Sequence, residues 1–320
     1  MEAVGSRRRC AWSFAVARTS EASPPAARRQ TSAGVVNAKL IVRLGDFYRR
    51  VLHVFWGIVG PNAAYRMMGA LARRFYRSYE PVRLRSEAQC RAALGDRPDV
   101  AEIAERAFVH RCWNLVDLAL ADRFLRASTI SRYGGRIPSP LLELLLDAQR
   151  RGRPVILVTA YYGPFDLLPV FLGYNGVRAG VVYRPHANAA FDAYRKAVRG
   201  RSGCEMISTA DVLIRVPAIL EQGGTVAILS DHHAGPRGVL TTFLGLPTRV
   251  SRSVALLADR YGAFVGVAGI HRVGGRFRFE LLAEDYFGPD AWRDEPDPIT
   301  YITRRTIAAL ERLVLSDPSQ

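Results

Sequence analysis

The segment Tyr161–Asp166 has residue types and spacing that could support proton transfer. It follows the apolar run Val155–Thr159, which has the composition of a buried strand. A phenol and a carboxylate five positions apart can reach the same side of a strand-to-helix turn. An ordinary phenol has a pKa of about 10, so only about one Tyr161 side chain in a thousand is ionised at pH 7. Asp166 could act as a base, or it could cap a helix that begins near Leu167.

A second group of polar residues lies in the segment Val182–Asn188 and includes Tyr183, Arg184 and His186. The rigid guanidinium of Arg184 could stabilise an oxyanion or hold a phosphate. The alternative for this arginine is a surface salt bridge.

The third group, Ala227–Gly238, contains Asp231 followed by His232 and His233. Either histidine, or His186, could act as a general base from another loop at the same sheet edge. The alternative is that the two adjacent histidines are solvated or structural.

These blocks together resemble the lipid A (HtrB-type, lauroyl/myristoyl) acyltransferases of the lysophospholipid acyltransferase superfamily. The family loop is typically H-x-G-N-W-E, and here Gly163, Phe165 and Asp166 are in register while Tyr161 replaces the histidine. Further similarities are a Y-R-P segment, a P-D-Q segment in which histidine replaces glutamine, an F-F-G-x-P segment and an L-A-x-x-x-G-A segment. The resemblance covers residues 40–315, and it is most specific over 154–270.

The resemblance implies transfer of a fatty acyl chain from acyl carrier protein or acyl-CoA to a hydroxyl of a lipid A precursor or related glycolipid. In the family, histidine takes the hydroxyl proton and the acidic residue orients the imidazole. The alternative is a catalytically silent member that binds lipid or acyl carrier. The predicted catalytic residues are Tyr161, Asp166, Arg184 and Asp231, and the predicted substrate-binding residues are Gly163, Phe165, Tyr183, His186, His232 and His233. Neither a metal nor a cofactor is expected.

Strand-like apolar runs alternate with helical patterns from residue 154 onward, which predicts an α/β fold. We expect a largely parallel central sheet flanked by helices and preceded by N-terminal amphipathic helices. The turn 272–275, Arg-Val-Gly-Gly, predicts an antiparallel edge. The expected strands are 155–160, 180–183, 226–230, 239–243, 264–270 and 276–282. The expected helices of this part are 141–150, 167–172, 189–199, 211–221, 251–261 and 299–315.

The chain divides into three predicted parts: a disordered tail at 1–36, a helical membrane-interface region at 37–126, and an α/β acyltransferase domain at 127–320. In the second part, apolar and aromatic residues alternate with arginines, and Pro61 is expected to separate two helices. Such a helix could lie in a membrane interface, or its apolar face could pack on the catalytic domain. A further helix is expected at 100–125.

The formal charge of +16 favours phosphate-bearing or acidic partners such as lipid head groups, a membrane surface or acyl carrier protein. Nucleic acid is not an expected partner, because no recognisable nucleic-acid-binding motif is present. Four scattered cysteines without C-x-x-C spacing indicate a reducing environment. No apolar run is long enough for a conventional transmembrane helix. Together with these features, the resemblance implies a protein on the cytoplasmic face of the inner membrane, either peripheral or interfacially anchored.

Overall fold

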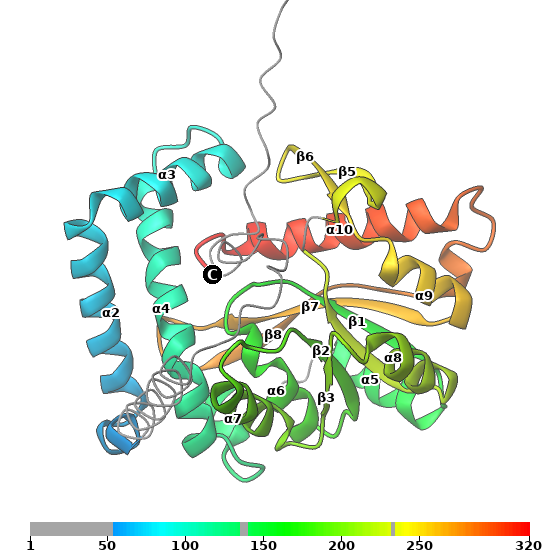
Figure 1. The fold of residues 1–320 in the computed structure, drawn as a ribbon, viewed down its shortest axis with the longest axis horizontal. Helices are drawn as coiled ribbons and strands as arrows, with labels where there is room; N and C mark the ends of the chain where they lie inside the picture. Colours follow the sequence, from blue (N-terminus) through cyan, green and yellow to red (C-terminus); the bar gives the residue numbers. More distant parts are fainter. Residues whose placement is uncertain (1–53, 135–139, 232–233) are drawn as a thin grey trace, which may run out of the picture.

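The fold is a sheet between two layers of helices, with a helical unit at one end (Figure 1). The computed structural model describes residues 54–134, 140–231 and 234–320. The predicted tail at 1–36, the first residues of the predicted membrane-interface region, and His232 and His233 lie outside the described residues.

Six strands form the central sheet, in the order β3-β2-β4-β1-β7-β8. The first five are mutually parallel and β8 is antiparallel to β7, which confirms the predicted fold class. The hairpin after Arg272 joins β7 to β8, as its two glycines predicted. The strands are β1 Val155–Thr159, β2 Ala179–Tyr183, β3 Glu205–Ser208, β4 Thr225–Leu229, β7 Phe264–Arg272 and β8 Phe279–Phe287.

A separate two-stranded sheet consists of β5, Val239–Phe243, and β6, Leu246–Val250. The two residues between them, Leu244 and Gly245, both have positive φ, of 50° and 70°. This is the requirement of a tight two-residue hairpin turn whose twist matches that of the flanking strands. The predicted strand at 239–243 is therefore present, but it pairs outside the central sheet.

Both faces of β1 are buried, and its alternating side chains enter two different cores. Leu157 packs in the core that includes residues of α5, α6 and α7, whereas Ile156 and Val158 pack in the core that includes residues of α8, α9 and α10. The continuous apolar run in the sequence is thus the mark of a central parallel strand. The helices are α5 Pro140–Arg150, α6 Leu168–Tyr174, α7 Ala189–Gly200, α8 Val212–Glu221, α9 Ser253–Tyr261 and α10 Pro298–Ser316. Short 3-10 turns lie at Ile130–Tyr133, Phe165–Leu167, Gly235–Arg237 and Pro289–Ala291.

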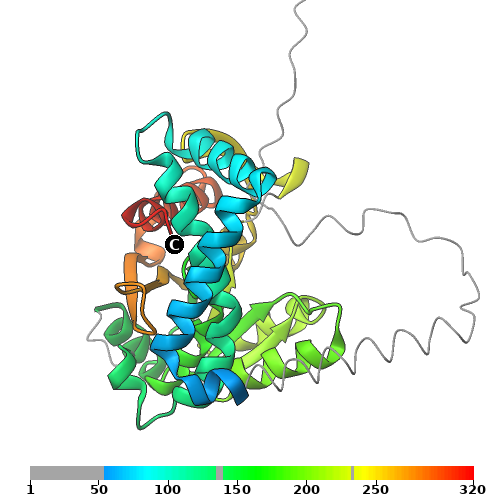
Figure 2. The same cartoon turned by 90° about the vertical axis from the view of Figure 1, so that its left-hand side faces the viewer.

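The helical unit consists of α2 Pro61–Ser78, α3 Glu80–Leu94 and α4 Val100–Phe124. Helices α2 and α4 run side by side at the end of the sheet (Figures 1 and 2). Residues 54–59 are helical and α2 begins at Pro61, so this proline separates two helices as predicted. Small residues of α2, Ala64 and Ala72, are buried in the core that also contains residues of α4. None of the described helices combines the length and apolarity needed to cross a membrane.

Candidate active site

The segment Tyr161–Asp166 follows β1 directly and lies at the carboxyl edge of the parallel sheet, where ligands bind in open α/β folds. Asp231 follows β4, the neighbour of β1 in the sheet. The Tyr161 amide donates a hydrogen bond to Oδ2 of Asp231 over 2.8 Å. The structure therefore brings two of the predicted catalytic residues together through a backbone amide.

Asp166 forms an ion pair with two arginines that the sequence reasoning did not select. Its carboxylate lies 3.4 Å from the guanidinium of Arg195 and forms a shorter ion pair with Arg199. Both arginines lie on α7, four residues apart, and they therefore share one helix face. Helix α6 begins after Leu167 without a side-chain cap, so the alternative in which Asp166 caps this helix is wrong.

Asp166 has more cationic partners than one carboxylate needs. Two guanidinium groups pair with the one carboxylate of Asp166 in a largely buried place, and a further carboxylate beside this loop is that of Asp231, which also acts on Tyr161. The side chain of Arg199 is only 6% exposed, and its Nε has no hydrogen-bond partner among the described residues. Burial lowers the pKa of Arg199, and Asp166 opposes that effect. Of the two arginines, Arg195 has the more accessible side chain, 19% exposed, and is the one that can offer a donor to an anionic oxygen.

The phenol of Tyr161 is half exposed and its ring meets that of Phe165 edge-on at a centroid distance of 4.7 Å. Partial burial, followed by the charges of Asp231 and Asp166, raises the pKa of Tyr161 above its ordinary value. A phenol whose pKa is raised is a poorer base at neutral pH than a free tyrosine, but it remains a hydrogen-bond donor. The Tyr161 hydroxyl is therefore suited to donate a hydrogen bond rather than to accept a proton.

The segment Tyr183–Asn188 is held in place mainly by Asp192 of α7. The Tyr183 hydroxyl donates to Oδ2 of Asp192 over 3.2 Å, and the His186 amide donates to Oδ1 over 2.7 Å. Nδ1 of His186 accepts a hydrogen bond from the Asn188 amide at 3.0 Å. Arg184 is exposed and makes no hydrogen bond or ion pair with the described residues. The surface salt bridge considered for this arginine is thus absent from the described part.

A buried polar cluster lies behind the loop, where β7 meets α2 and α4, and the sequence reasoning did not find it. The Arg272 side chain is fully buried and forms an ion pair with Asp117 of α4. Nε of Arg272 donates to the Tyr65 hydroxyl over 3.0 Å, and one terminal nitrogen contacts Nδ1 of His110 at 3.1 Å. These residues are far apart in the chain, so no local motif could have shown their association.

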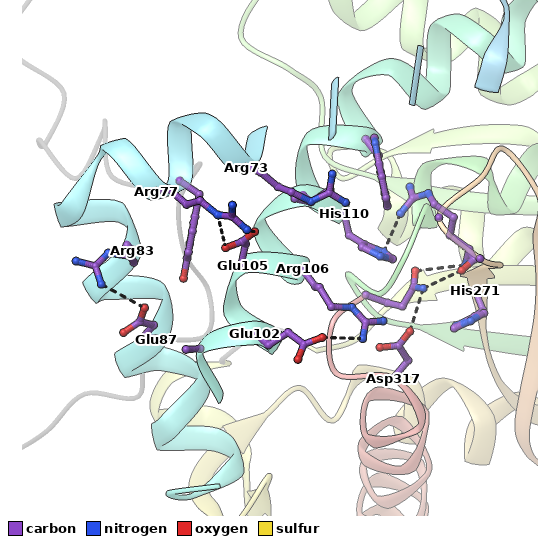
Figure 3. A pocket seen from close by; sticks show the side chains of 18 residues that line it. Arg73, Arg77, Arg83, Glu87, Glu102, Glu105, Arg106, His110, His271 and Asp317 are labelled. Atoms are coloured by element: carbon purple, nitrogen blue, oxygen red, sulfur yellow. Dashed lines mark hydrogen bonds and ion pairs between the residues drawn. The ribbon is translucent and has the colours of Figure 1, made fainter. Parts of the chain in front are cut away.

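A cavity of about 670 Å³ adjoins this cluster, between the helical unit and the end of β7 (Figure 3). Its walls carry both charge signs, and several of these side chains pair with one another. Arg77 lies 2.8 Å from Glu105, and Arg106 lies 3.9 Å from Glu102. None of the predicted site residues that the structure describes lines this cavity. It is therefore separate from the loop site, and its charges are largely balanced by one another.

The described residues contain no group of three or more His, Cys, Asp or Glu side chains arranged to hold a metal ion. The functional groups described at the loop site are hydrogen-bond donors, such as the Tyr161 hydroxyl and the guanidinium groups, and the carboxylates of Asp166 and Asp231. Cys90, Cys112 and Cys204 are free thiols.

The chain is an α/β protein in which an acid-bearing loop follows a central strand and meets a basic helix face at one edge of a mostly parallel sheet. Residues 40–320 match the bacterial lipid A biosynthesis acyltransferases, and the chain belongs to this family. The resemblance stated from the sequence motifs is confirmed. No match was found among curated proteins.

Proposed function

We propose that this protein transfers a fatty acyl chain from a thioester of acyl carrier protein or coenzyme A to a hydroxyl of a lipid A precursor or related glycolipid. The hydroxyl oxygen attacks the thioester carbonyl, the carbon–sulfur bond breaks, and the proton of the hydroxyl passes through a base to the leaving thiolate. The observation that carries this proposal is the family match, with Tyr161, Asp166 and Asp231 gathered around one loop.

The positive charge beside Asp166 supports a role in stabilising the oxyanion that forms on the thioester carbonyl. Arg195 and Arg199 supply that charge, and the phenol of Tyr161 can add a neutral donor. Exposed Arg184 is proposed to meet an anionic group of the substrate, such as a phosphate. Gly163 and Phe165, and Tyr183 and His186, would form the walls on either side.

Neither Tyr161 nor Asp166 is well suited to accept the proton. The pKa of Tyr161 is raised, and Asp166 is already engaged by two guanidinium groups. We therefore place the base in the segment Asp231–His233. Asp231 contacts the loop, and a histidine titrates near neutral pH.

The test is acyl transfer from labelled acyl carrier protein to an extracted bacterial lipid pool. Replacing His232 and His233 together with alanine should lower turnover by about 100- to 10 000-fold, the usual contribution of a general base. Tyr161→Phe is the matched variant and should retain turnover within about tenfold, because only a donor is lost. Loss of all turnover in Tyr161→Phe, with the double histidine variant unaffected, would refute this assignment.

A second function, lipid or acyl-carrier binding without turnover, is favoured by one observation. The carboxylate that should orient an imidazole is shared by Arg195 and Arg199, and position 161 holds no imidazole. In that case the wild type would bind acyl carrier protein or lipid but release no product with any donor. Turnover by the wild type would exclude this second function.

We also propose that α2 lies against the cytoplasmic face of the inner membrane. Apolar side chains recur at four-residue intervals on its outer face: Met67 is 47% exposed, Leu71 62% and Phe75 49%. Arginines at positions 66, 73, 74 and 77 accompany them. Apolar side chains flanked by arginines suit an interface of acyl chains and anionic head groups.

Vesicle sedimentation tests this location. Leu71→Glu combined with Phe75→Glu should weaken binding to vesicles of anionic phospholipid at least tenfold. Leu213→Glu is the matched control, because Leu213 is 87% exposed but lies on α8. Equal loss in both variants, or equal binding of the wild type to purely zwitterionic vesicles, would contradict the proposal.

A further inference from the structure

The side chain of Asn114 on α4 connects the loop site to the buried cluster around Arg272. Its Nδ2 donates a hydrogen bond to the carbonyl oxygen of Gly163 over 3.0 Å. Its Oδ1 accepts a hydrogen bond from a terminal nitrogen of Arg272 over 2.6 Å. The amide nitrogen of Asn114 thus bonds to the loop, and its amide oxygen bonds to the buried cluster.

The guanidinium of Arg272, to which Asn114 is hydrogen-bonded, is itself fixed by several contacts. The guanidinium of Arg272 lies over the rings of Tyr65 and Trp113, with centroid distances of 5.6 and 5.5 Å. The same guanidinium pairs with Asp117, whose side chain is 1% exposed. A fixed guanidinium leaves the amide of Asn114 a single favourable orientation, because its oxygen must face Arg272 and its nitrogen then faces the loop.

The loop is confined at the same residue from the other side. Gly163 has φ of +55°, a conformation that favours glycine, and a Cβ at this position would lie 2.1 Å from the carbonyl oxygen of Ile270. Gly163 therefore lies between β7 and Asn114. Two residues before it stands Tyr161, and three residues after it stands Asp166.

We propose that Asn114 is a positioning residue for the Tyr161–Asp166 loop, and that Arg272 acts through it by fixing its orientation. The proposal rests on the proposed acyl transfer for its consequence in catalysis. A misplacement of about 1 Å in a reacting group can lower a rate about 100-fold, while substrate binding far from that group is unaffected. Loss of the Asn114 hydrogen bond should therefore lower kcat and leave KM nearly unchanged.

The first measurement is hydrogen exchange, detected by mass spectrometry on a peptide that spans residues 158–168. In the wild type, amides of the loop part of this peptide are hydrogen-bonded at Tyr161 to Asp231, at Leu167 to the Pro164 carbonyl over 2.8 Å, and at Leu168 to the Phe165 carbonyl. Asn114→Ala should raise exchange in this peptide at least tenfold. This readout is independent of any turnover.

Asn114→Asp separates the two ends of the side chain. A carboxylate can still accept from Arg272, but it cannot donate to the Gly163 carbonyl. This variant should therefore show loop exchange as fast as that of Asn114→Ala. The matched control is Gln149→Ala, which removes another side-chain amide bonded to a glycine carbonyl, that of Gly176 at 3.1 Å. This pair precedes β1 and β2 and therefore lies at the amino edge of the sheet, opposite the loop. It should leave exchange in the loop peptide unchanged.

The second measurement is the steady-state kinetics of acyl transfer. Asn114→Ala and Asn114→Asp should both lower kcat by about 10- to 100-fold and change KM by less than about threefold, whereas Gln149→Ala should change neither. If the loop of both Asn114 variants exchanges as slowly as that of the wild type, the positioning role is overturned, while the proposed acyl transfer is unaffected. If the wild type shows no turnover but both Asn114 variants show faster loop exchange, the positioning role is supported and the proposed acyl transfer is not.

Discussion

His110 is expected to make the folded protein sensitive to mild acid. Its imidazole is buried, and Nδ1 faces a terminal nitrogen of Arg272 at 3.1 Å. Burial first, and then the positive charge of Arg272, lower the pKa of His110 from 6.5 to about 4. Asp317 and Gln320 act in the opposite direction, while Arg106 adds to the lowering. His110 is therefore neutral at pH 7, and its Nδ1 accepts the hydrogen bond from Arg272.

The sign and size of the effect follow from proton linkage. Between pH 4 and 6.5 the unfolded chain binds the His110 proton more readily than the folded chain, so stability falls as the pH falls through this range. Each pH unit of difference in pKa corresponds to about 1.4 kcal/mol. For a pKa of about 4 against 6.5, the contribution lost between pH 7 and pH 5 is about 2 kcal/mol.

Urea unfolding of the wild type and of His110→Gln at pH 5 and pH 7 measures this contribution. Burial also lowers the pKa of His271, so the wild type alone would not isolate one group. The comparison does so, because the variant keeps every other titrating residue. The stability of the wild type relative to the variant should be about 2 kcal/mol lower at pH 5 than at pH 7. A change below about 0.5 kcal/mol would refute the linkage to His110.

Three further predictions concern stability measured by urea unfolding. Gly163→Ala should cost at least about 2 kcal/mol, because the new methyl group meets a backbone carbonyl oxygen at a positive φ, and a cost below about 0.5 kcal/mol would contradict that geometry. Leu310→Ala, at a fully buried position of α10, should cost about 2–5 kcal/mol, whereas Leu315→Ala at a half-exposed position of the same helix should cost less than about 1 kcal/mol; similar costs would be inconsistent with this packing. Asp166→Asn should cost about 3–5 kcal/mol, because the buried guanidinium of Arg199 loses its counter-charge, and an unchanged midpoint would show that the ion pair contributes nothing.

Much of the fold could be predicted, because strands buried on both faces appear in the sequence as continuous apolar runs. The apolar runs that became β1, β2, β4 and β7 are central parallel strands, and the glycine turn after Arg272 indicated the antiparallel edge. Strand β3, Glu205–Ser208, was missed because it is short and lies at the edge of the sheet, beside a single neighbour. Strand β6, Leu246–Val250, was missed because proline and arginine interrupt its apolar pattern.

The site was predicted only where its residues are close in the chain. The loop and Asp231 came from motifs, and the structure joins them. The partners of Asp166 lie 29 and 33 residues further on, and nothing in a single sequence pairs a carboxylate with arginines at such distances. The four-residue spacing of Arg195 and Arg199 was a usable signal, since it indicated a doubly basic face of α7. The partners of Arg272 gave no such signal.

The pairing of Asp117 with Arg272 also sets an order of events during synthesis. The two residues are 155 positions apart, so at about 5–20 residues per second the arginine leaves the ribosome about 8–31 s after the aspartate. Until then α2 and α4 cannot bury Asp117 without leaving a charge unpaired, a state that costs several kcal/mol. The helical unit is synthesised before β7. It is nevertheless expected to bury the Asp117 carboxylate only after β7, which carries Arg272, has been synthesised. The nascent chain would hold its first helices open until the sheet that they cover is nearly complete.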